Sequence, residues 1–194
     1  METTKVLLIV DSHDDNSIEL QEALSNNNFL IIDVLNIKND ININSFSNDI
    51  SVLVCQFRRV KTAYLDTIAS LVHNNPCPII LFTRDDSSDA IEQSVKIGVN
   101  AYIVDGFNSE RIKPIIEVAI SRFKSYQKMA GELQKTRQQL EDRKLIDRAK
   151  GILMKSKKMD EQQAYKTIQK MAMDKSKSMG DIARSIIDVM EIMD

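Results

Sequence analysis

The sequence predicts an α/β domain built on a doubly wound parallel sheet over residues 1–121, followed by an all-helical region. Two observations carry this prediction. Five apolar, β-branched runs alternate with amphipathic segments before residue 122, as in a parallel sheet that is covered on both faces. After Pro114 no proline occurs for eighty residues, and only three glycines interrupt this stretch.

The expected strands are near-continuous apolar runs, namely Val6–Val10, Leu30–Leu35, Val52–Cys55, Ile79–Phe82 and Ala101–Val104. Between them, apolar residues recur at helical spacing over Ile18–Leu24, Tyr64–Val72 and Ala90–Ile97. The Asn-rich stretch Asn36–Asn48 is expected to be an irregular connection. Such a series of units fits a flavodoxin-like (βα)5 domain, whose functional edge lies at the carboxyl ends of the strands.

Charge divides the chain into two parts. Residues 1–121 have a formal net charge of −8, whereas residues 122–194 have +6 and hold eight of the nine methionines. This shift predicts a domain boundary near residue 122, and the C-terminal part has the sign needed to bind a polyanion. We therefore expect an α/β domain over residues 1–121, a linker helix over 122–145 and a helical bundle over 146–194.

The linker carries a heptad pattern. Its apolar positions are Ala119, Phe123, Tyr126, Ala130, Leu133 and Leu140, with Arg137 as a basic residue in the series. Such a pattern predicts a homodimeric coiled coil, although it also suits a long helix that lies on its own domain. A continuous helix from Glu110 to Lys155 would be about 70 Å long, which favours a partner helix.

Two further helices are expected to complete a three-helix bundle. Asp160 precedes Gln163 by three residues, the spacing of a capping box. Ser178 stands three residues before Asp181 and is expected to cap the last helix. The segment Met173–Met179 between these helices is expected to be a long basic connection.

Polar residues follow the expected strands of the first domain. Asp11 ends the first strand, Cys55-Gln56 the third, Thr83 the fourth, and Asp105 the fifth. This pattern resembles the receiver domain of bacterial response regulators. The resemblance implies a magnesium-binding acidic pair after the first strand, a phosphoacceptor aspartate after the third, a Thr or Ser after the fourth and a Lys-Pro step after the fifth.

Most of that receiver chemistry is missing. The neighbour of Asp11 is Ser12, and the phosphoacceptor position falls on Cys55 or Gln56, neither of which has a carboxylate. Asp105 replaces the lysine, which reverses a charge that phosphoryl transfer requires. We therefore expect a pseudo-receiver with no phosphoacceptor and a degenerate pocket of Asp11, Thr83 and Asp105.

Several classes of protein are not supported. No apolar run reaches eighteen residues, so no membrane span is expected. The N-terminus lacks a signal-type pattern, and Cys55 and Cys77 with two histidines predict neither a disulfide framework nor a metal site, so a cytoplasmic protein is expected. Cys55 is either a buried apolar residue or a redox-sensing thiol. No catalytic constellation or phosphate loop occurs, so neither an enzyme nor a cofactor is expected.

The helical bundle carries the more specific motif. The run Ala149-Lys150-Gly151-Ile152-Leu153-Met154 is followed by the Ala164-Tyr165 pair and then by Ala183. These residues closely resemble the ANTAR domain, the RNA-binding module of transcription antitermination regulators. One departure is Lys170, where arginine is usual. The resemblance implies that nascent leader mRNA with hairpins is the partner.

The residue types agree with an RNA-binding surface. Gly151 within a helix costs about 1 kcal/mol against alanine and needs a reason, such as close helix packing or close approach of a ligand. Tyr165 either packs between helices or stacks on a base. The candidate RNA-binding residues are Arg148, Lys150, Gly151, Lys155, Lys157, Lys158, Tyr165, Lys175 and Lys177.

The whole chain resembles antiterminators that join a pseudo-receiver to an ANTAR domain, the AmiR/NasR group. The Asp105-Gly106 step looks more like the NasT-like members, which implies control of nitrate and nitrite assimilation genes by a protein that a ligand-sensing partner holds inactive. Three alternatives stay open: an amidase-operon-type antiterminator, a DNA-binding two-component response regulator, and a signalling adaptor. A helix-turn-helix is less favoured because its turn has only about three or four residues, whereas the connection expected over Met173–Met179 is longer.

Overall fold

The computed structural model describes residues 3–11, 15–38, 50–105 and 108–193. They divide into two compact units, Met1–Tyr126 (unit 1) and Gln127–Asp194 (unit 2). Ser12 and most of the Asn-rich stretch, for which an irregular connection is expected, lie outside the described residues.

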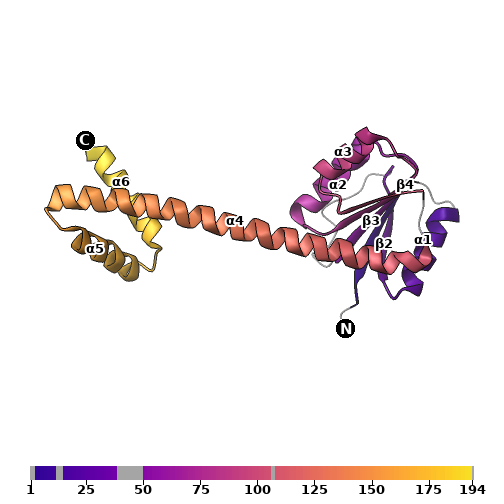
Figure 1. Ribbon diagram of the computed structural model, residues 1–194, viewed down its shortest axis with the longest axis horizontal. Coiled ribbons are helices and arrows are strands. Elements are labelled where there is room, and N and C mark those ends of the chain that lie inside the picture. The colour runs from indigo at the N-terminus through magenta and orange to yellow at the C-terminus, as the bar shows by residue number, and fades with distance from the viewer. Residues whose placement is uncertain (1–2, 12–14, 39–49, 106–107, 194) are drawn as a thin grey trace. The chain divides into compact units, whose positions relative to one another are not determined.

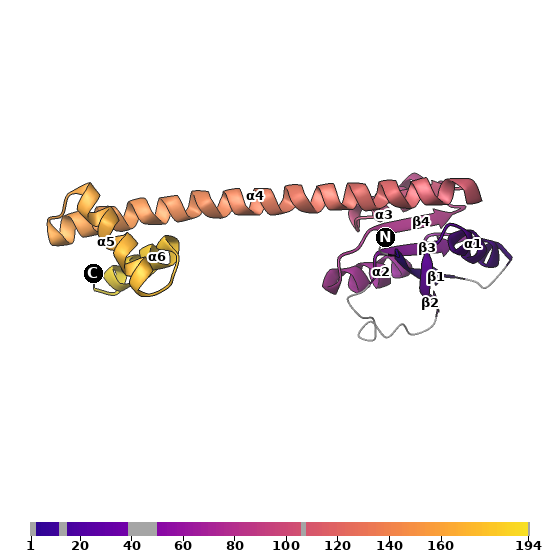
Figure 2. The ribbon, with the colours of Figure 1, turned by 90° about the horizontal axis from the view of Figure 1, so that it is seen from below.

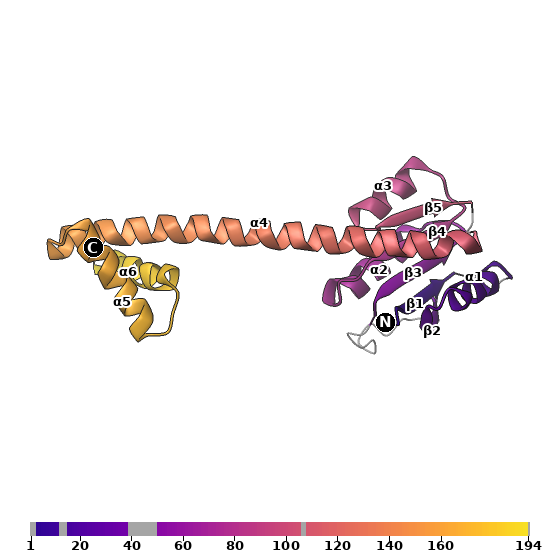
Figure 3. The same ribbon diagram turned by 60° about the horizontal axis from the view of Figure 1, so that its bottom comes forward.

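Unit 1 contains a five-stranded parallel sheet. Its strands are β1 (Lys5–Val10), β2 (Leu30–Asn36), β3 (Val52–Phe57), β4 (Ile79–Thr83) and β5 (Ala101–Val104). The strand order is β2-β1-β3-β4-β5 (Figure 3), and the register pairs Val10 with Gln56, and Phe57 with Thr83. The predicted flavodoxin-like sheet is confirmed, and each expected apolar run forms a strand.

Helices cover both faces of this sheet (Figure 1). They are α1 (Asp15–Asn26), α2 (Thr62–Asn74), α3 (Ser88–Lys96) and the first part of α4 (Ser109–Lys157). Successive β3 residues alternate between two cores: Val54 packs with residues of α1 and α4, and Cys55 packs with residues of α2. Because β-strand side chains point to opposite faces in turn, residues 52–57 supply both cores.

Unit 2 is a bundle formed by the C-terminal part of α4 with α5 (Glu161–Asp174) and α6 (Met179–Met193), as Figure 2 shows. Its core consists of small and branched aliphatic residues, namely Ala149, Leu153, Ala164, Ile168, Ala172, Ile182, Ala183 and Ile187. The predicted long helix and the two helices after it are therefore confirmed.

Both predicted caps form. The Asp160 carboxylate accepts a hydrogen bond from the Gln163 N–H at 2.7 Å, and the Gln163 side chain accepts one from the Asp160 N–H at 3.1 Å. The Ser178 hydroxyl accepts a hydrogen bond from the Asp181 N–H at 3.0 Å. These bonds satisfy amide groups that have no partner within the helix.

The connection between α5 and α6 is shorter than the sequence predicts. Helix α5 continues to Asp174 and α6 begins at Met179, so only the four residues Lys175–Ser178 lie between them. The expected long connection over Met173–Met179 is wrong because both helices extend into it, which the Ser178 cap makes possible. A four-residue turn has the length seen in helix-turn-helix proteins.

Candidate functional site

The first candidate site is the carboxyl edge of the sheet in unit 1. The Asp11 N–H donates to the Gln56 carbonyl at 3.3 Å, and the Asp11 carboxylate accepts from the Arg58 N–H at 3.1 Å. Thr83 is buried, and the Asp105 N–H donates to its carbonyl at 3.0 Å. The backbone thus brings Asp11, Gln56, Thr83 and Asp105 to one edge.

Cys55 and Gln56 differ in their surroundings. Cys55 is fully buried in the core that α2 covers, and this burial raises the pKa of its thiol. Gln56 is half-buried at the strand end, and its Oε1 atom is buried without a hydrogen-bond partner in the described part of the chain. The pocket edge therefore carries an amide, and the inert, protonated thiol lies away from it.

Asp85 organises the loops at this edge, a role that the sequence analysis missed. Its carboxylate accepts hydrogen bonds from the Ser87 hydroxyl at 2.6 Å and from the Val60 N–H at 3.2 Å, while its carbonyl accepts one from the Tyr102 hydroxyl at 2.7 Å. The bond from Ser87 is the main reason why the pKa of Asp85 is lowered. The Asp-x-Ser spacing before α3 is the signal that could have identified it.

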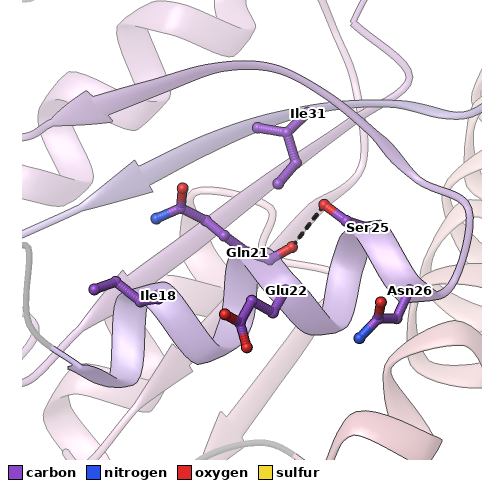
Figure 4. Close-up of a pocket in the computed structure, with 6 residues that line it drawn as sticks. All are labelled: Ile18, Gln21, Glu22, Ser25, Asn26 and Ile31. Atoms are coloured by element: carbon purple, nitrogen blue, oxygen red, sulfur yellow. Dashed lines mark hydrogen bonds between the residues drawn. The ribbon is translucent and has the colours of Figure 1, made fainter.

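A second feature of unit 1 is a surface hollow between α1 and β2 (Figure 4). Its lining residues are Ile18, Gln21, Glu22, Ser25, Asn26 and Ile31. The Ser25 hydroxyl donates to the Gln21 carbonyl at 2.9 Å, and the Gln21 amide donates to the Ser17 carbonyl at 3.1 Å. These polar groups serve the backbone of α1, so we assign no site to the hollow.

In unit 2, Lys150 links α4 to α5. Its ammonium lies 2.8 Å from the Asp147 carboxylate and 2.7 Å from the Glu161 carboxylate, and only 15% of its side chain is exposed. Hydrogen bonds to both carboxylates raise the pKa of Lys150. This candidate RNA-binding lysine is therefore engaged within the bundle, where two carboxylates neutralise its charge and use two of its three N–H donors.

The other basic candidates lie on the surface of unit 2. Arg148, Lys155, Lys157, Lys158, Lys175 and Lys177 are all exposed. Lys158 has φ +54° and Ser176 has φ +50°, so a non-glycine residue occupies the left-handed region in each turn beside α5. This conformation favours glycine, so both residues are expected to carry some backbone strain.

For Gly151 and for Tyr165, the structure excludes the packing role that the sequence left open. A Cβ atom at Gly151 would meet no heavy atom of the described residues within 4 Å outside its own helix segment. Close helix packing therefore does not explain this glycine. Tyr165 is 44% exposed, so it is not a core residue between helices. Both residues are therefore accessible from outside the helical core of unit 2.

The middle of α4 exposes the apolar residues of the heptad pattern. Tyr126, Leu133 and Leu140 are each more than half exposed, and Ala130 is also exposed. Phe123 is half-buried. Met129, which the predicted register leaves out, is as exposed as these residues. Within the described residues, therefore, this apolar stripe has no intramolecular cover from Tyr126 onward.

Among the described residues, no cluster of three or more His, Cys, Asp or Glu side chains could hold a metal ion. No helix in those same ranges is long and apolar enough to cross a membrane.

Comparison with solved structures identifies the fold of unit 1. The signal receiver domain of a modulated diguanylate cyclase from Desulfovibrio desulfuricans superposes with a TM-score of 0.54 at 15% identity, covering 64% of this chain and 99% of that domain. A two-component response regulator from Clostridium difficile gives 0.51 at 21% identity, covering 62% and 98%. Unit 1 has the receiver fold.

Residues 134–187 match the ANTAR domain family. The C-terminal part of the chain therefore carries an ANTAR domain, and unit 1 before it has the receiver-like fold. It is homologous to the transcriptional regulatory protein PdtaR of Mycobacterium tuberculosis, with 32% identity over 126 residues, 65% of this chain and 62% of that protein. It is also homologous to the nitrate regulatory protein of Klebsiella oxytoca, with 38% identity over 77 residues, 40% of this chain and 19% of the relative.

The chain thus spans less than two thirds of the length of these relatives. Both relatives are regulatory proteins by name.

Proposed function

We propose that this protein is a transcription antitermination regulator whose ANTAR bundle binds hairpins in nascent leader mRNA in the cytoplasm. The observation that carries the proposal is the set of exposed basic residues around both turns of unit 2, together with the exposed Tyr165. Lysines bind phosphates regardless of sequence, and an aromatic ring stacks on an unpaired base. Lys150 and Gly151 lie beside this surface at the helix junction.

The pseudo-receiver is proposed to serve as a docking domain for a ligand-sensing regulatory protein that keeps the regulator inactive. Gln56 has no carboxylate that could form an acyl phosphate, and Asp105 is an anion where a phosphoryl group would need a cation. In this proposal, therefore, control by protein binding replaces control by phosphorylation. The homology to a nitrate regulatory protein supports nitrate or nitrite assimilation genes as the target. Amidase-type control would use the same bundle on a different transcript.

A homodimer through residues 122–145 is part of the proposal. The exposed positions Tyr126, Leu133 and Leu140 repeat every seven residues, and a second copy of α4 would bury them. Two bundles held in one dimer would bind paired hairpins with a higher effective concentration than two separate monomers.

A DNA-binding regulator is the second candidate, because the four-residue connection between α5 and α6 fits a helix-turn-helix. Filter-binding titrations with an RNA hairpin and with duplex DNA of the same stem sequence separate the two candidates. We expect tight binding to the hairpin and only weak, salt-sensitive binding to the duplex. Preference for the duplex would overturn the RNA proposal.

Salt dependence measures how many lysines contact phosphates. If about four of the basic side chains do so, log K should fall with log salt at a slope between roughly −3 and −4. Single replacement of Lys155 or Lys157 by alanine should flatten this slope and lower affinity similarly for different loop sequences. An unchanged slope would mean that these lysines are only solvated.

A further inference from the structure

Helix α5 carries an exposed stripe of uncharged residues that is separate from its buried residues and from its lysines. Gln162, Tyr165, Gln169 and Met173 follow one another at intervals of three, four and four residues, so they lie along one side of the helix. All four are exposed, and Met173 is 74% exposed. The buried residues of α5, Ala164, Ile168 and Ala172, face the core of unit 2 instead.

The two glutamines of this stripe are available for a ligand. In the described part of the chain neither Gln162 nor Gln169 makes a side-chain hydrogen bond, whereas their neighbour Gln163 belongs to the capping box. A carboxamide carries both a donor and an acceptor, the combination that pairs with the edge of a base. Tyr165 offers a ring for stacking, and Met173 offers a flexible, polarisable surface for apolar contact.

Basic residues surround the stripe. Residues 155–177 contain seven lysines and three acidic residues, a balance of +4. Lys155, Lys157 and Lys158 lie before α5, and Lys175 and Lys177 lie after it. Because α5 has 14 residues, these two groups are separated by about 20 Å along the helix axis. A polyanion that contacts both groups would extend along α5, whose exposed surface includes the stripe.

We propose that the stripe of Gln162, Tyr165, Gln169 and Met173 reads unpaired bases of the hairpin loop, while the lysines at both ends of α5 hold the flanking phosphates. The inference rests on the proposed RNA-binding function and adds which side chains determine loop specificity. Lys150 is a positioning residue in this proposal, because its ion pair with Glu161 holds the first turn of α5, where the stripe begins.

The test uses the full chain and a pool of RNA hairpins that share one stem and carry randomised loops. Selection with the wild-type protein yields an enriched loop, and the ratio of its affinity to that of a scrambled loop measures discrimination. We expect Gln162→Ala and Gln169→Ala each to reduce this ratio about tenfold, as expected for one lost hydrogen-bonded base contact. Affinity for the scrambled loop should stay unchanged.

Gln139→Ala is the matched control, since Gln139 is an exposed glutamine of α4 outside the bundle. It should leave the discrimination ratio unchanged. Circular dichroism must show that every variant keeps its helix content. Met173→Ala, at a side chain that is 74% exposed, provides a second variant if a glutamine variant fails to fold, and it should also lower the discrimination ratio.

The outcomes are distinguishable. If the wild-type protein binds no hairpin from the pool, the proposed RNA-binding function fails. If the wild-type protein discriminates between loops and both glutamine variants keep the full ratio, or lose affinity equally for both loops, RNA binding stands and the base-reading role of the stripe is overturned.

Discussion

The carboxylate of Asp142 on α4 occupies the space that a side chain at Gly180 on α6 would need. A Cβ atom at Gly180 would lie 2.6 Å from Asp142 Cγ and 3.2 Å from its Cβ. The same carboxylate accepts a hydrogen bond from the Gln138 amide at 2.8 Å. Gly180 lies in the first turn of α6, where the helix dipole favours a negative charge. This close approach places the start of α6 against α4.

We therefore expect Gly180→Ala to destabilise unit 2 by about 1–2 kcal/mol, because Asp142 must move away from its hydrogen bond and from the helix end. Urea unfolding followed by the helical circular dichroism signal measures the loss. Gly131→Ala is the matched control: a Cβ atom at Gly131 would have no described atom outside its own helix segment within 4 Å, and the variant should stabilise α4 by about 1 kcal/mol. Asp142→Ala should restore much of the stability of Gly180→Ala, and failure to do so would contradict this account.

Two variants of Lys158 should separate the effect of backbone strain on stability from the effect of charge on RNA affinity. Its φ of +54° is strained for lysine and ordinary for glycine. Lys158→Gly should therefore raise the stability of unit 2 by about 0.5–1 kcal/mol relative to Lys158→Ala. Both variants lose the charge, so both should lower RNA affinity to the same extent in filter binding. Equal stability of the two variants would show that the backbone strain is negligible.

The sequence predicted the elements of the fold well because their signals are local. Buried parallel strands need continuous apolar runs, and the Asp160 and Ser178 caps lie three residues from their partners. The end of α5 was harder to predict, because Asp174 is a poor helix former and Lys175 is a good one, so helix propensity does not mark the last residue.

The site was less predictable than the fold, since its contacts join distant segments. The ion pair between Lys150 and Glu161 spans the α4–α5 turn, and no spacing rule reveals it. The contact of Asp142 with Gly180 joins residues far apart in the chain. Conversely, the exposure of Tyr165 depends on the angle at which α5 packs, which the sequence left open.

We expect that acetyl phosphate does not phosphorylate the pseudo-receiver. Incubation of the full chain with acetyl phosphate and magnesium should leave its intact mass unchanged, because the strand end carries the Gln56 amide and Asp105 repels a phosphoryl group. Mass spectrometry under neutral conditions measures the adduct, and a receiver with an intact phosphoacceptor serves as the positive control. One phosphoryl group mapped to the carboxyl edge of the sheet would contradict the prediction.

The raised pKa of Tyr102 predicts that the stability of unit 1 depends on pH. Burial, followed by the charges of Asp85 and Asp86, raises the pKa of Tyr102 to about 12. Below the ordinary value of about 10, both the folded and the unfolded chain keep the proton. Between these values the unfolded chain loses the proton and the folded chain retains it, so stability should fall as pH rises. Urea unfolding across this range should show a weaker fall for Tyr102→Phe, and identical slopes would place Tyr102 outside this linkage.

If the proposed coiled coil forms, Leu133→Asp should convert the dimer into a monomer, because a charge would be buried at the centre of the interface. Sedimentation equilibrium measures the change, with Gln139→Asp as a control away from the apolar stripe. A wild-type protein that is monomeric at tens of micromolar would contradict the proposed dimer.

The exposed Met129 raises the question of which residues alternate with Tyr126, Leu133 and Leu140 in that dimer. One register places Ala130 and Arg137 in the interface, as the sequence analysis expected, and the other places Met129 and Thr136 there. A leucine stabilises the dimer only at a position that becomes buried. If Arg137 faces the partner, Arg137→Leu should tighten dimerisation about tenfold, whereas Thr136→Leu should have little effect. The opposite result would assign the register that contains Met129, and no gain from either variant would mean that this stretch of α4 does not form the interface.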